Sequence, residues 1–175
     1  MYEVFYACIC EGAAEEVVIN ILLDAQKLKF SREDLLEEKV IRCRMAKKFE
    51  ERYLRKHFNK KLTILRILDS KNENFKLREI YRNKVDVIDV VTSPEIEMLV
   101  IINEGKYEEY QKYKSTLSPS KYCTDKLGMK SVKNSKFLYT YFSDVDKLVN
   151  AIKIYKRKTK IDNGKKCLAD LLISE

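Results

Sequence analysis

The sequence has few of the residues that break or loosen a chain, with four glycines and two prolines among 175 residues. Long flexible linkers are therefore not expected, and the length suits one compact domain with a sizeable core. Apolar runs are too short to cross a lipid bilayer. The N-terminus does not resemble a secretion signal, because Glu3 interrupts a short apolar run. We expect a cytoplasmic protein with no membrane contact.

Several catalytic signatures are also missing. His57 is the only histidine, and no GxSxG motif accompanies it, which argues against a serine or cysteine hydrolase. Neither a P-loop nor a GxGxxG motif occurs, which disfavours nucleotide-driven motors and dinucleotide enzymes. The five cysteines contain no CxxC pair, so a zinc site is not expected and the thiols are interpreted as reduced and mostly buried.

Positive charge is what the chain has in excess: 35 Lys and Arg stand against 27 Asp and Glu, a net charge of +8. A polyanion, DNA or RNA, is the favoured partner. Such charge runs are also typical of solvated helix faces, and that alternative stays open. The candidate nucleic-acid-binding residues are Lys47, Lys48, Arg52, Arg55, Lys71, Lys156, Arg157 and Lys158.

The apolar pattern predicts an α/β protein with a mainly parallel sheet flanked by helices. Strands are expected at 2–10, 62–68 and 85–91, with a short edge strand near 40–43, and segments of helical periodicity separate them. Strands that alternate with helices favour parallel pairing. We expect the α/β core to span residues 1–105 and a helical extension, packed on that core, to span 106–175.

Two acids follow predicted strands. Glu11 comes directly after the first strand and Asp69 after the strand at 62–68. Sites in parallel sheets form beyond the carboxyl ends of the strands, and Mg²⁺ needs only one or two protein carboxylates. Gly12 would leave room for a metal or a phosphate. The alternative is that these acids cap helices.

Glu97 is the third candidate. It precedes the run Met98–Ile102, so its helix is apolar on all sides and should be buried. A carboxylate there is costly unless it is paired or coordinated. A structural ion pair with an arginine and a place in a metal site are equally compatible with this pattern.

The segments "VFYACICEGAAEEVVINILL", "TILRILDS", "SPEIEMLVIINE" and "DVDKLVNAIKIYKRK" resemble motifs of small Toprim-like proteins of the RloB sort, which accompany restriction and phage-defence loci. The resemblance implies a Toprim-like sheet, a Mg²⁺ or Mn²⁺ cofactor, and Glu11, Asp69 and Glu97 as catalytic and metal-binding residues. Lys71 replaces the second aspartate of the family's Asp-x-Asp pair, which makes Glu73 a candidate substitute ligand. Asn103 stands where histidine is usual.

The resemblance implies a metal-dependent nuclease, a hydrolase of nucleic-acid phosphodiesters, in phage defence or a mobile element. The alternative is a non-catalytic basic adaptor that binds nucleic acid or a partner protein, such as an ATPase or another defence subunit, through a degenerate Toprim scaffold. The two hypotheses differ in whether metal-stimulated cleavage occurs.

Overall fold

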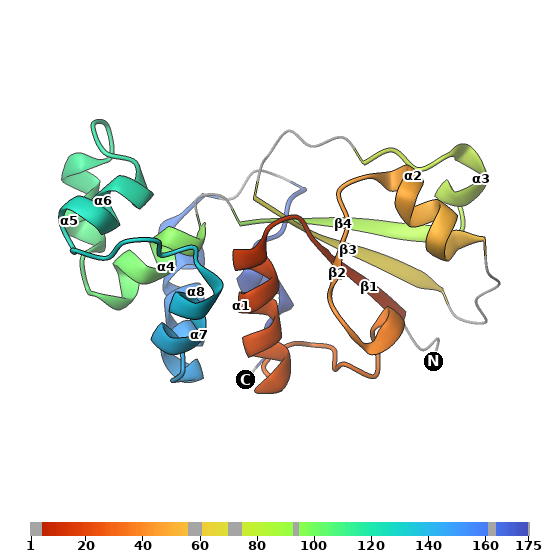
Figure 1. Cartoon of the computed structure of the whole chain (residues 1–175), viewed down its shortest axis with the longest axis horizontal. Coiled ribbons are helices and arrows are strands. Elements are labelled where there is room, and N and C mark those ends of the chain that lie inside the picture. The colour runs from red at the N-terminus through yellow and green to blue at the C-terminus, as the bar shows by residue number, and fades with distance from the viewer. Residues whose placement is uncertain (1–4, 56–60, 70–74, 93–94, 161–163, 175) are drawn as a thin grey trace.

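The computed structural model describes residues 5–55, 61–69, 75–92, 95–160 and 164–174. It shows a four-stranded, all-parallel sheet in the order β2-β1-β3-β4, with helices around it (Figure 1). The prediction of a mainly parallel α/β fold is confirmed. The strands are β1 (Phe5–Cys10), β2 (Ile41–Arg42), β3 (Leu62–Leu68) and β4 (Val85–Val91).

The helices follow the predicted alternation with strands. Helices α1, α2 and α3 connect the strands, with a π-helical turn η2 directly after α2, and α4 to α8 follow β4. Their bounds are α1 (Ala13–Asp24), η1 (Leu36–Glu38), α2 (Ala46–Phe49), η2 (Glu50–Leu54), α3 (Glu79–Arg82), α4 (Glu95–Asn103), α5 (Tyr107–Tyr113), α6 (Pro119–Asp125), α7 (Ser135–Tyr141), α8 (Val145–Lys158) and η3 (Leu168–Leu171).

Side-chain alternation along the strands produces two apolar layers. Cys8 and Cys10 point to one face of β1, as predicted for residues two apart on a strand, and join a core with α1, α4, α6, α7 and α8. Ala7 and Ile9 point to the other face and pack against α2 and η2. Every residue of β3 is buried, because this central strand is covered on both faces.

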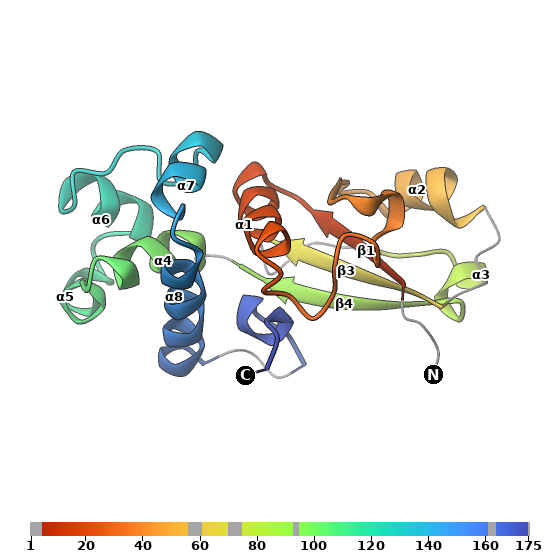
Figure 2. The same ribbon diagram turned by 90° about the horizontal axis from the view of Figure 1, so that it is seen from below.

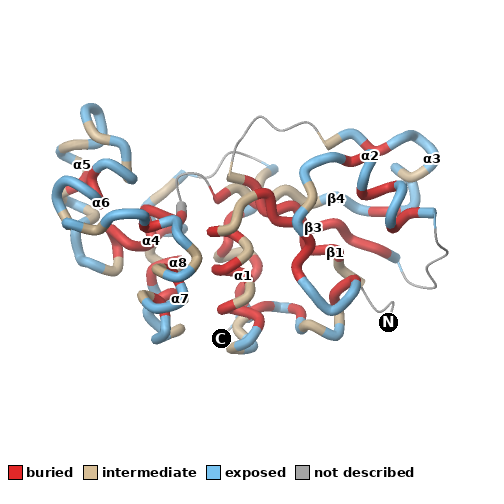
Figure 3. Tube along the Cα trace, in the orientation of Figure 1, coloured by how far each residue is buried: buried red, intermediate tan, exposed pale blue. Residues whose placement is uncertain are grey.

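The later helices lie beyond the carboxyl ends of the strands, next to α1, rather than across a face of the sheet (Figures 1 and 2). Burial is continuous from β1 and β3 through α1 to α4, whereas α5 and α6 carry many exposed residues (Figure 3). The C-terminal segment returns to the sheet, where the Lys166 backbone pairs with Asp89 and Val91 of β4. The carboxyl edge of the sheet is thus enclosed between α1 and this helical region.

Among the described residues, none of the helices combines the length and the apolar character that crossing a lipid bilayer requires.

Candidate functional site

Two separate groups of charged residues occupy the carboxyl edge of the sheet. The first contains Glu11, the second Asp69 and Glu97. Glu11 continues β1, since its backbone N–H donates to the Ile67 carbonyl at 3.4 Å. Asp69 follows β3, whose last residue, Leu68, has its carbonyl held by the backbone and the hydroxyl of Thr92 at 2.7 and 2.9 Å. Extended sheet pairing therefore positions both acids.

Glu11 is buried beside an arginine. Its side chain is 2% exposed, and Oε1 accepts a hydrogen bond from Nη2 of Arg66, itself 4% exposed, at 3.4 Å. Arg66 also pairs with Asp89 at 3.0 Å, and its guanidinium lies 4.6 Å from the centre of the Phe75 ring. The strand register places Ile9, Arg66 and Asp89 side by side. This group is a buried ion-pair network, and the predicted metal-binding role of Glu11 stays a prediction.

Asp69 and Glu97 are brought together around an acid that the sequence analysis did not consider. Glu15, in the first turn of α1, is 2% exposed. Burial raises the pKa of its carboxyl, and the charges of Asp69 and Glu97 raise it further, while its own backbone N–H and Lys133 act in the opposite direction. Asp69 and Glu97 are therefore each close enough to Glu15 to repel its charge. We call Glu15, Asp69 and Glu97 the acidic group.

Glu97 is held in this group by one lysine. Its Oε1 lies 3.5 Å from Nζ of Lys133, whose side chain is 43% exposed, between α6 and α7. Its Oε2 is buried and has no hydrogen-bond partner among the described residues. A buried carboxylate oxygen without a partner is costly, so this atom is the clearest sign that a ligand belongs here. The residue that forms an ion pair with Glu97 is therefore a lysine, Lys133, and not the arginine that the sequence suggested as one alternative.

Gly12 lies directly against the side chain of Glu15. Its backbone is extended, with φ −110°, so glycine is not required for its conformation. A Cβ atom at this position would lie 2.1 Å from Oε2 of Glu15. Gly12 therefore makes room for the Glu15 carboxylate to fold back over the end of β1.

The thiol of Cys123, which lies next to Glu97, is not a nucleophile. Burial and the charge of Glu97 raise the pKa of Cys123 to about 12. The thiol therefore stays protonated near neutral pH, which leaves carboxylates and Lys133 as the reactive groups of this edge.

The donor chemistry of the acidic group suits a hard divalent cation, since Mg²⁺ and Mn²⁺ prefer carboxylate oxygens. Among the described residues, no three His, Cys, Asp or Glu side chains are already grouped tightly enough to hold a metal ion. Mg²⁺ keeps several waters and needs one or two carboxylates. Glu97 Oε2 and the Asp69 carboxylate are thus the candidate ligands, and the predicted ligand Glu73 lies outside the described residues.

The predicted nucleic-acid-binding residues fall on two distant parts of the molecule. Lys47, Lys48, Arg52 and Arg55 are exposed on α2, η2 and the residue that follows. Lys156, Arg157 and Lys158 are exposed in the last turn of α8, on the far side of α1 from α2 (Figures 1 and 2). Lys71 and the lone histidine, His57, lie outside the described parts of the chain.

Several of these basic residues are already engaged. Arg52 lies 3.6 Å from Glu37 and over the ring of Tyr53. Lys156 pairs with Asp170, and Lys158 with Glu108.

Sequence reasoning missed Glu15, Lys133 and Arg66. For Arg66 there was a signal, because a charged residue inside the apolar run "TILRIL" indicates a buried ion pair.

The raised pKa of Glu15 predicts that Glu15→Gln stabilises the protein at pH 7. In the folded state the carboxyl binds its proton more tightly than in the unfolded state, so wild-type stability falls as pH rises above the ordinary value of 4.5. The glutamine variant avoids this loss. Thermal melts from pH 7 down towards pH 4.5 should show a higher Tm for the variant at pH 7 and a shrinking difference on acidification.

The neighbouring Glu16→Gln is the matched control, because Glu16 is partly exposed and faces Arg42 at 3.8 Å. It should not raise the Tm at pH 7. Equal stabilisation by both substitutions, or a lower Tm for Glu15→Gln, would show that the Glu15 carboxylate carries no electrostatic cost.

No protein-family model, curated protein or solved structure matches the chain.

Proposed function

We propose that the protein is a metal-dependent nuclease whose reaction centre is the acidic group of Glu15, Asp69 and Glu97 with Lys133. The observation that carries the proposal is the buried Oε2 atom of Glu97, which lacks a hydrogen-bond partner among the described residues and belongs to a carboxylate that repels the charge of Glu15. A divalent cation would supply both the missing partner and the missing positive charge.

The position of the group supports the same proposal. It lies at the carboxyl edge of a parallel sheet, where ligand sites of such folds form. The all-parallel sheet and the alternation of strands and helices are consistent with the parallel architecture that the Toprim resemblance implies. The net charge of +8 favours a polyanionic substrate, either DNA or RNA.

In phosphodiester hydrolysis, water forms a bond to phosphorus while the bond to the leaving sugar oxygen breaks. Asp69 and Glu97 would hold a Mg²⁺ or Mn²⁺ ion, which would supply electrostatic activation of the phosphate and of the attacking water. Glu15, whose carboxyl pKa is raised, is the side chain of the group best able to hold the proton that the water loses. Lys133 is accessible enough for its ammonium to contact a non-bridging phosphate oxygen.

The direct test is cleavage of single- and double-stranded DNA and RNA with Mg²⁺ or Mn²⁺ and with EDTA. The proposal expects cleavage with metal and none with EDTA. Equal cleavage under both conditions contradicts it. Salt-sensitive binding without cleavage would favour the alternative, a basic adaptor that binds nucleic acid or a partner ATPase in a defence or mobile-element system.

Gly12→Ala should lower metal-dependent cleavage roughly a hundredfold, because the added methyl group displaces the Glu15 carboxylate and small misplacements of reacting groups cost about this much. Stability should change little, since the clash is with the end of a flexible side chain. Steady-state cleavage rates and thermal melts measure the two effects. Gly128→Ala is the control for cleavage alone: nothing lies within 4 Å of its added Cβ, but its φ of +67° strains the backbone, so this variant should keep the wild-type cleavage rate while its Tm falls. Full activity in Gly12→Ala would remove Glu15 from the reaction centre.

A further inference from the structure

A second feature lies at the opposite end of α1 from the acidic group. A pocket of about 510 Å³ opens between α8, the residue Lys29 and the C-terminal segment 169–174. Glu15 is in the first turn of α1, whereas Lys29 comes five residues after its end. Because a helix rises about 1.5 Å per residue, a helix of this length separates the two places by roughly 18 Å.

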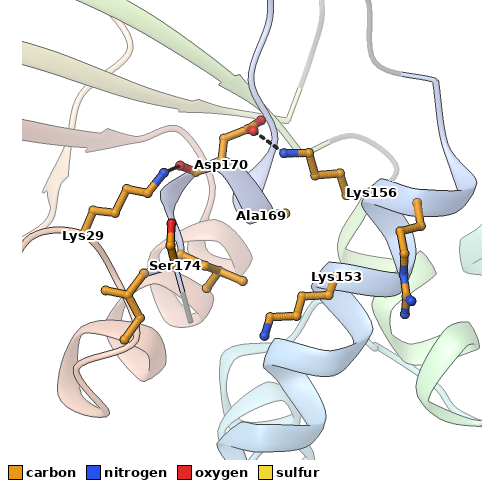
Figure 4. A pocket seen from close by; sticks show the side chains of 9 residues that line it. Lys29, Lys153, Lys156, Ala169, Asp170 and Ser174 are labelled. Carbon is orange, nitrogen blue, oxygen red and sulfur yellow. Dashed lines mark hydrogen bonds and ion pairs between the residues drawn. The ribbon is translucent and has the colours of Figure 1, made fainter.

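Four basic side chains and one acidic side chain line this pocket: Lys29, Lys153, Lys156 and Arg157, with Asp170. Lys29 and Lys156 approach Asp170 from opposite sides, and Lys153 extends from α8 towards the space between the helix and the C-terminal segment (Figure 4). Lys153, Lys156 and Arg157 lie close together on α8, and the fold brings Lys29 to them from the other end of the chain. Its positive excess makes a pocket of this kind attractive to an anion.

The walls of the pocket are fixed in place. Lys29 Nζ donates to the Asp170 carbonyl at 2.8 Å, and Lys156 pairs with the Asp170 carboxylate. Although burial alone would raise the pKa of Asp170, hydrogen bonds from Lys156 and from the Cys167 backbone lower it, so the carboxylate is charged at neutral pH. Backbone pairing of Leu28 with Leu172 attaches the C-terminal segment to the end of α1.

The lining carries four cationic side chains and one carboxylate, and the bond from Lys29 to a neutral carbonyl leaves the Lys29 charge unchanged. The remaining lining includes Ala169, Leu172 and Ile173, which form an apolar part next to the charges. A phosphate beside a sugar or base presents the same combination of anion and apolar surface. The volume falls within the range of about 300–1,000 Å³ that is typical of small-ligand sites.

We propose that this pocket binds the phosphate and sugar of one nucleotide unit, with Lys153 and Arg157 as its main phosphate contacts. The ligand is either a nucleotide within a nucleic-acid strand or a free nucleotide. The choice of this ligand class rests on the proposed function, but binding here requires neither a metal ion nor the acidic group.

The test is fluorescence anisotropy with a labelled oligothymidylate about ten nucleotides long, in EDTA, between about 50 and 200 mM salt. The double variant Lys153→Gln/Arg157→Gln should bind about tenfold more weakly at low salt. Its salt dependence should be shallower by roughly 1.4 in log–log slope, because each lost phosphate contact on a single strand contributes about 0.7. Lys153→Arg, which keeps the charge, should bind like wild type.

The matched control is Lys112→Gln/Lys114→Gln on and after α5, which removes the same charge from another exposed position. If the pocket variant and this control bind alike, the pocket is not the site. Competition with thymidine monophosphate distinguishes the two possible ligands. If micromolar thymidine monophosphate displaces the oligonucleotide, the ligand is a free nucleotide. If it does not, the ligand is a nucleotide within a strand. The binding assay contains EDTA and therefore measures binding without metal-dependent cleavage. If the pocket variant binds like wild type, the pocket proposal fails and the nuclease proposal is unaffected. If no metal-dependent cleavage is found, the binding measurement still tests the pocket.

Discussion

Replacing Arg66 by alanine is expected to lower the free energy of unfolding by about 3–5 kcal/mol, because removal of one partner from a buried ion pair leaves the other charge uncompensated. Arg66 and Glu11 are 4% and 2% exposed, so water cannot replace the lost guanidinium. The contact with the Phe75 ring is lost as well. Urea or guanidinium denaturation measures the change directly, and the Tm should fall by roughly 6–20 °C for a chain of this size.

An exposed Arg–Glu pair in the same protein provides the control. Arg42 is 55% exposed and lies 3.8 Å from Glu16, so Arg42→Ala should cost less than about 1 kcal/mol. Equal losses for the two variants would show that the Arg66–Glu11 pair is not a structural element. The expected loss also explains why Glu11→Ala is a poor test of catalysis, since inactivity there would not distinguish a missing ligand from a damaged sheet edge.

Glu97→Gln is expected to reduce metal-dependent cleavage roughly a thousandfold without loss of stability. A metal ligand supports several kcal/mol of transition-state stabilisation, and each 1.4 kcal/mol corresponds to about tenfold in rate. Glutamine has nearly the same volume as glutamate and removes a charge from a buried position, so the fold should be retained or stabilised. Cleavage rates at saturating Mg²⁺ and thermal melts separate the two effects.

Glu104→Gln controls for a change of the same type near the end of the same helix. Glu104 is exposed, and its carboxylate accepts a hydrogen bond from Tyr141 at 2.6 Å. This variant should cleave at the wild-type rate. Comparable rates for Glu97→Gln and wild type would place the reaction centre elsewhere.

The sheet was predictable because its strands are apolar runs bounded by polar residues. The bounds of β3 and β4 agree with the predicted 62–68 and 85–91. The start of α6 was also readable, since Ser118 accepts a hydrogen bond from the Lys121 backbone at 3.3 Å, as its position before Pro119 indicates. The start of α8 is harder to read, because Ser143 and Asp144 are both suitable capping residues and only the structure shows that Asp144 caps the helix.

The site was less predictable than the fold. Asp69 and Glu97 could be selected because each combines an acid with a strand end or an apolar helix. Glu15 resembles any acid in the first turn of a helix, where the helix dipole explains it, and only the fold shows its burial. Lys133 lies in a loop far along the chain, so only tertiary structure brings it to Glu97. The pairing of Glu11 with Arg66 likewise depends on the order of the strands.

The most direct test of the acidic group is a Mn²⁺ titration of the purified protein followed by electron paramagnetic resonance, which reports free Mn²⁺ and therefore counts bound ions. Wild-type protein should bind Mn²⁺, and Mg²⁺ should compete with it. The affinity for Mn²⁺ should be at least tenfold weaker in Glu97→Gln and unchanged in Glu104→Gln. Absence of bound Mn²⁺ in the wild type, or equal affinity in wild type and Glu97→Gln, would contradict the assignment of a metal site to Asp69 and Glu97.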